Sequence, residues 1–167
     1  MPNNNYLAMF KHIFLMLFLG VVLVACDKGS EDSNLVEAEV LVPTLSDANI
    51  KAFTIKMAAD YKENLNSLMA GFQSAKKEGN EYQFVNFRNH TWTPAYIKQK
   101  DYYQKVFENN ASYLAQSPSK PLFDKFESLI YVGITLKNAL LDKDDVKLKA
   151  QLAVIENDKN IVNNMVQ

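Results

Sequence analysis

The chain has 167 residues, which suits a single domain, and its formal net charge at pH 7 is −1. It has no basic excess and no clustered stripe of lysine and arginine, so the composition argues against nucleic-acid binding. A single cysteine excludes an intrachain disulfide, and only five glycines and five prolines favour long regular elements over a many-turned β fold. Side-chain packing must therefore supply the stability.

The first element along the chain is a short apolar run, residues 13–24, which follows one basic residue, Lys11. The tetrapeptide LVAC closes this run at Cys26, and a polar stretch begins directly after it. The run is shorter than the roughly 20 residues that a membrane-spanning helix needs. An ordinary secretory signal shares the charged start and apolar core, but it does not need a cysteine after the cleavage site.

These residues resemble a bacterial lipoprotein signal peptide with its lipobox. The resemblance covers residues 1–26 only. It implies that diacylglycerol is attached to the Cys26 thiol, that residues 1–25 are removed, and that the new amino terminus is acylated. Two or more acyl chains give stable anchoring, because each buried methylene contributes about 0.8 kcal/mol. We therefore expect a lipoprotein of the bacterial cell envelope, attached to a membrane through Cys26, with its domain in the periplasm.

Residues 26–45 are expected to form a flexible tether between the lipid and the domain. The end of this segment, residues 35–42, is apolar and β-branched and precedes Pro43. This pattern fits a short strand or an extended segment lying on the domain. Fully extended, the tether would reach about 60 Å at ~3.3 Å per residue.

The first helix is expected over residues 47–78, with Ser46 as its N-cap. Apolar residues then recur every three or four positions, which is typical of an amphipathic helix. Gly79 fits the position just beyond the helix, where glycine adopts a left-handed conformation.

The segment 81–92 is ambiguous, because its aromatic residues mix helical and alternating spacing. Thr93 and Pro94 then predict a new helix, with Thr93 as N-cap and Pro94 as its first residue. This helix is expected over about 94–116. Two prolines in the segment 117–121 end it.

Two further helices follow. The third begins near Leu122 and carries Gly133 in its apolar stripe, where a glycine permits close approach of another helix. Residues 142–145 predict a turn and a new N-cap, and the last helix carries an apolar stripe from Leu148 to Val162.

This pattern predicts an all-α domain over residues 46–167, an antiparallel bundle of about four helices in up-down-up-down order. The alternative is an irregular all-α domain in which residues 81–92 form a fifth helix.

Few residues suit catalysis. His90 is the only histidine once residues 1–25 are removed, the only thiol is the lipidation site, and no glycine-rich phosphate loop occurs. The sequence also lacks the histidine and carboxylate spacing of a metal site. We therefore expect no enzymatic activity, no cofactor and no metal.

The middle of the chain concentrates aromatic residues around one arginine and one histidine. Tryptophan, tyrosine and arginine are favoured anchors at protein interfaces, so this region is the candidate binding site for a protein partner of unknown identity. The candidate residues are Tyr82, Phe87, Arg88, His90, Trp92, Tyr96 and Tyr103. The other interpretation is that these side chains fill the bundle core.

Two functions therefore remain open. In the first, the membrane-anchored domain binds a protein partner, which requires an exposed surface patch. In the second, the domain carries a small apolar ligand or cofactor, which requires an apolar pocket between helices of roughly 300–1,000 Å³.

Overall fold

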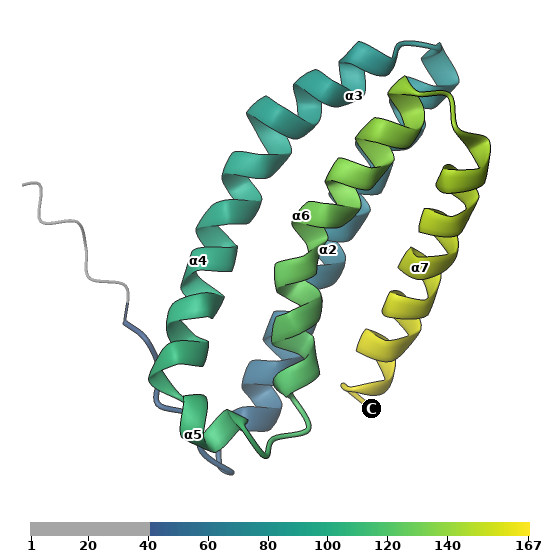
Figure 1. Ribbon diagram of the computed structural model, residues 1–167. Helices are drawn as coiled ribbons and strands as arrows, with labels where there is room; N and C mark the ends of the chain where they lie inside the picture. Colours follow the sequence, from purple (N-terminus) through teal and green to yellow (C-terminus); the bar gives the residue numbers. More distant parts are fainter. Residues whose placement is uncertain (1–40) are drawn as a thin grey trace, which may run out of the picture. The chain divides into compact units, whose positions relative to one another are not determined.

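The computed structural model describes residues 41–167, and all regular secondary structure in this range is helical (Figure 1). The signal peptide, Cys26 and most of the expected tether lie outside the described residues. The helices are α2 (Ile50–Glu78), α3 (Glu81–Phe87), the π-helical turn η1 (Arg88–Trp92), α4 (Thr93–Asn109), α5 (Ala111–Leu114), α6 (Lys120–Leu141) and α7 (Asp145–Asn164). The predicted all-α class is confirmed.

Four long helical rods make up the described part of the chain, because α3, η1 and α4 continue into one another (Figure 1). The third rod, α6, packs against α2, α4 and α7, and α2 also contacts α3 and α7. Consecutive rods run in opposite directions. The arrangement is the antiparallel bundle that the apolar stripes predict.

The start of α2 differs from the sequence prediction. The helix begins at Ile50, after a turn in which Ser46 O accepts from the N–H groups of Asn49 and Ile50. The Asn49 side chain closes this turn, because it accepts from Ser46 N–H and donates to Thr44 O, both at 2.9 Å. Ser46 is therefore not the N-cap. An asparagine side chain can donate and accept hydrogen bonds at the same time, so Asn49 can bond to both Thr44 and Ser46 of the turn.

The end of α2 agrees with the prediction. Gly79 has φ 65° and ψ 28°, in the left-handed region. The next residue, Asn80, donates its N–H to Ala75 O at 3.0 Å, and this bond over five residues is the 6→1 bond of a Schellman motif. The chain therefore reverses direction at Gly79 and enters α3.

The segment 81–92 is helical, and the predicted break at Thr93 is wrong. Thr93 has helical angles and donates its N–H to Arg88 O, five residues back, which is a π-type bond. Pro94 has no N–H, and in a regular helix its ring would crowd the carbonyl of His90. The wider π turn accommodates Pro94, so the rod continues from α3 into α4 without a new cap.

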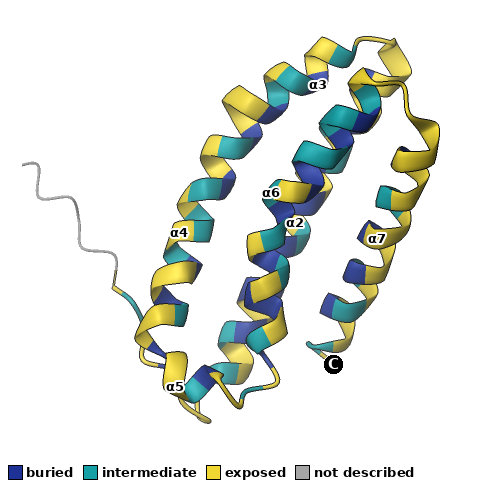
Figure 2. Ribbon diagram, in the orientation of Figure 1, coloured by how far each residue is buried: buried dark blue, intermediate teal, exposed yellow. Residues whose placement is uncertain are grey.

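Aromatic rings fill the interior between α2, α4 and α6, and the dark blue faces in Figure 2 turn toward one another. Neighbouring ring centres lie 4.7–5.9 Å apart along this row, which follows the order Phe53, Tyr103, Phe126, Tyr96 and Trp92. We call these five rings the aromatic ladder. The ladder leaves the middle of the bundle tightly packed.

An ion pair joins α7 to α6. Lys125 Nζ lies 2.6 Å from Asp158 Oδ1, and the Asp158 side chain is only 7% exposed. At the start of α7, Asp144 Oδ1 accepts from Lys147 N–H at 2.9 Å, which confirms the predicted cap in the turn 142–145.

Asn110 interrupts the helix that the sequence extends to residue 116. Its backbone angles, φ −122° and ψ 19°, separate α4 from the short α5. Its side chain accepts from Leu45 N–H at 2.7 Å and donates to Pro43 O at 2.9 Å. Leu45 is buried, so the end of the expected tether lies on the bundle. Residues 41–45 contain no strand.

Candidate functional site

The candidate binding residues do not form one exposed surface. Trp92, Tyr96 and Tyr103 are 3%, 0% and 2% exposed and belong to the aromatic ladder. Of the remaining candidates, Phe87 is half-buried, Arg88 is buried, and Tyr82 and His90 are exposed. The exposed aromatic patch expected from the sequence is thus divided, because the α3–η1–α4 rod turns most of its rings toward α2 and α6.

The polar atoms of the buried rings are occupied by the scaffold. Trp92 Nε1 donates to Asn64 O at 2.9 Å, and the Tyr96 hydroxyl donates to Phe126 O at 2.9 Å. The Tyr103 hydroxyl donates to Asp60 Oδ2 at 2.5 Å. Burial raises the pKa of Tyr103 above its ordinary value, and the hydrogen bond and charge of Asp60 raise it further. These phenols therefore stay protonated at neutral pH and serve as structural donors.

Arg88 differs from its neighbours because its guanidinium is incompletely paired. It is the only arginine of the chain and the first residue of the π turn. Its Nη1 donates to Asn89 Oδ1 at 2.9 Å, but Nε is buried and has no hydrogen-bond acceptor within residues 41–167. Burial lowers the pKa of the Arg88 guanidinium. A buried donor without an acceptor is uncommon in folded proteins and calls for a physical reason.

Gly133 of α6 makes room for this arginine. A Cβ atom on Gly133 would lie 3.1 Å from Arg88 Nε and 3.4 Å from Trp92 Cζ3. The space at Gly133, where the sequence suggests close approach of another helix, is taken by the side chains of Arg88 and Trp92. We call Arg88, Gly133 and Trp92 the arginine notch. The sequence signal for it is the four-residue step that joins Arg88 to Phe84, Trp92 and Tyr96 on one face.

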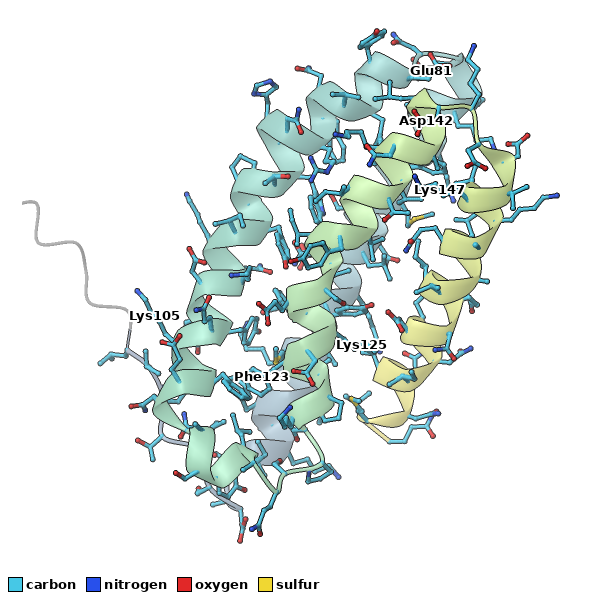
Figure 3. All side chains as sticks on the ribbon, in the orientation of Figure 1. Glu81, Lys105, Phe123, Lys125, Asp142 and Lys147 are labelled. Carbon is cyan, nitrogen blue, oxygen red and sulfur yellow. The ribbon has the colours of Figure 1, made fainter. Side chains whose placement is uncertain are left out.

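Three exposed apolar side chains lie close in sequence to the α2–α3 and α6–α7 turns, at one end of the bundle. They are Tyr82, which is 77% exposed, Val146 at 81% and Leu141 at 39%. A cleft of about 200 Å³ between Glu81 and Lys143 shows that the two turns adjoin. In Figure 3, Glu81, Asp142 and Lys147 lie at this end. We call it the distal end, because Asn110 fixes residues 43–45 at the opposite end.

A larger open cleft lies at the other, proximal end. Its volume is about 670 Å³, and the beginning of α2, the α5–α6 loop and the C-terminal residues surround it. Ile50, Ile55 and Met165 supply apolar surface. Thr54 Oγ1 and Ser119 Oγ share a hydrogen bond of 2.7 Å beside them. Sequence reasoning did not find this proximal cleft, because its lining comes from three segments far apart in the chain.

Comparisons of the chain with protein-family models, with curated proteins and with solved structures found no match. Within residues 41–167, no three histidine, cysteine or carboxylate side chains gather closely enough to hold a metal ion. In the same range, no helix combines the length and the apolar character needed to cross a bilayer.

Proposed function

We propose that the protein is a lipoprotein of the bacterial cell envelope, anchored through Cys26, whose bundle binds a protein partner at its distal end. The observation that carries this proposal is the exposure of Tyr82, Leu141 and Val146 around the two adjoining turns. Aromatic and aliphatic side chains at a surface supply the buried centre of protein interfaces.

The geometry of the bundle supports a distal docking surface. Asn110 binds Pro43 and Leu45 at the end where α2 begins. From there, the 29 residues of α2 extend about 43 Å at 1.5 Å per residue to the distal turns. Connections between helices also bind partners more often than the helices that carry them. Tyr82 and Val146 are therefore at the end of the bundle opposite residues 43–45.

Site-specific photo-crosslinking in the producing bacterium tests the proposal. A photoreactive amino acid is placed at Tyr82 or at Val146 of the full lipidated chain, and in a third strain at Lys105. Lys105 is also exposed and lies far from the distal end in Figure 3. We expect one adduct of the same mass from Tyr82 and Val146 and none from Lys105. Equal labelling at all three positions, or none at the distal pair, would contradict a distal docking surface.

The proximal cleft favours a second candidate function, the transport of a small apolar ligand. Its volume of about 670 Å³ lies in the range of ligand sites. It is an open cleft at the bundle end, whereas the space between the helices is filled by the aromatic ladder. Titration with a fluorescent fatty acid checks this function: a carrier would bind it, and Ile55→Asp would abolish the binding. Absence of binding would contradict the carrier function, and protein docking would remain as the proposed function.

A further inference from the structure

The arginine notch has an incompletely paired donor edge. Nε is buried and has no acceptor within residues 41–167, whereas Nη1 donates to Asn89 Oδ1 at 2.9 Å. Nε and Nη2 share one edge of the guanidinium plane, and such an edge can receive both oxygens of a carboxylate in a bidentate pair. Within the described residues, the structure therefore supplies the donor of such an ion pair without its acceptor.

No carboxylate of the described residues completes the pair, since the ion pairs within 4.0 Å all involve lysine. The sequence around the notch accounts for this. The stretches 64–77, 82–100 and 128–141 of the packed helices contain no aspartate or glutamate. They do contain cations, among them Lys137, which lies one helical turn beyond Gly133 on the same face of α6. The notch is positively charged and has no counter-charge of its own.

We propose that the arginine notch binds a side-chain carboxylate from an acidic segment of the protein partner. This inference rests on the proposed function and gives the partner a chemical character. An acidic segment fits better than an apolar one, because a buried guanidinium is costly unless an anion neutralises it. The notch lies on the same α3–η1–α4 rod as Tyr82.

Trp92 provides a direct readout, because it is the only tryptophan and lines the notch beside Gly133. The probe is a capped hexaglutamate peptide, titrated at 150 mM salt into the full lipidated chain in a non-ionic detergent. We expect a saturable change in Trp92 fluorescence with hexaglutamate and none with capped hexaglutamine. Arg88→Met should weaken hexaglutamate binding at least ten-fold. Lys98→Gln removes an exposed cation from the same stretch without acidic residues, 82–100, and should change the affinity for hexaglutamate less than two-fold.

Two further measurements distinguish a loss of binding from a loss of folding. Arg88→Met should unfold at the same or a higher urea concentration than the wild type, because it removes an unpaired buried charge while keeping an unbranched side chain that reaches as far as the position of Nε. If it unfolds earlier, Gly133→Ala replaces it as the test variant. The added Cβ would displace the guanidinium, which keeps its charge, and should weaken peptide binding several-fold.

The outcomes separate this inference from the proposed function. Equal hexaglutamate binding by the wild type and the test variant would overturn the notch as a carboxylate site. An Arg88-dependent fluorescence change with phosphatidylglycerol vesicles but not with hexaglutamate would overturn it too, in favour of a lipid headgroup. In either case the distal cross-links at Tyr82 and Val146 would stand or fall by themselves.

Discussion

Trp92 lies parallel to Tyr96, with 4.8 Å between the ring centres and 4° between the ring planes. Residues four apart on a helix face the same side, and here Trp92 lies beside Gly133 and Tyr96 beside Phe126, both of α6. Trp92 also donates to Asn64 O of α2, so one side chain links two rods.

We expect Trp92→Ala to lower the free energy of unfolding by about 3–5 kcal/mol, as truncation of a buried aromatic residue does. Urea denaturation followed by circular dichroism at 222 nm measures the loss. Tyr82→Ala is the matched control, because Tyr82 is exposed on the same rod and should change stability by about 0.5 kcal/mol or less. A loss of stability no larger for Trp92→Ala than for Tyr82→Ala would refute the buried position of Trp92.

Gly71 of α2 packs against the ring of Phe87, the last residue of α3. A Cβ at this position would lie 2.3 Å from Cδ1 of Phe87, which is too short for two non-bonded carbon atoms. Gly71→Ala should therefore reduce stability by about 1–3 kcal/mol, despite the better helix propensity of alanine.

A double-mutant cycle checks the cause. Phe87→Ala removes the obstructing ring, so Gly71→Ala should lower the free energy of unfolding much less in that background than in the wild type. An equal loss in both backgrounds would show that the clash with Phe87 is not the cause.

The sequence indicates the fold well where the signals are local. Gly79 marks the end of α2 because a left-handed residue is needed there, and Asp144 caps α7 with its own side chain. The segment 81–92 resists this reasoning for a physical reason. A π turn adds one residue to a helical turn, so the apolar stripe changes phase and resembles alternation. Thr93 and Pro94 then suggest a boundary that the wider turn makes unnecessary.

The candidate site was only partly accessible to sequence reasoning. Arg88 was identified by its residue type, but its missing acceptor depends on which groups the fold brings within reach. The exposure of Val146 and Leu141 and the lining of the proximal cleft depend on packing between segments distant in the chain. Such features have no local pattern. The same aromatic composition also suits a surface or a core, and the contacts with α6 decide for the core at Trp92 and Tyr96.

Alkaline pH should unfold the domain through its buried phenols. Burial is the main cause that raises the pKa of Tyr61, Tyr96 and Tyr103 above the ordinary value of 10.0. The folded state then holds these protons more tightly than the unfolded state. The stabilisation is complete below pH 10 and is lost as pH rises above it, by about 1.4 kcal/mol per pH unit for each phenol.

Urea denaturation between pH 9 and 11.5 measures how steeply the free energy of unfolding falls with pH. Tyr103→Phe should make this fall less steep, while Tyr82→Phe, which changes an exposed phenol, should leave it unaltered. A midpoint independent of pH above 10 would contradict the prediction.

Lipidation at Cys26 can be tested in the host. We expect labelled fatty acid to be incorporated into the wild type and not into Cys26→Ser, because the thiol is the attachment point. The mass of the mature protein should correspond to a chain that begins at residue 26. Equal labelling of the two proteins, or a different mature terminus, would exclude the lipoprotein assignment.

The bonds between Asn110 and residues 43–45 lie between the N-terminal segment and the first turn of α2. A pull on the chain ahead of Leu41 reaches Asn110 Oδ1 and Nδ2 before it reaches the first turn of α2. Asn110 Nδ2 also donates to Val106 O at 2.8 Å, so the load passes into the end of α4. Mechanical tension between an anchor and a bound partner would thus be shared by two rods, and α2 would not unwind from its first residue.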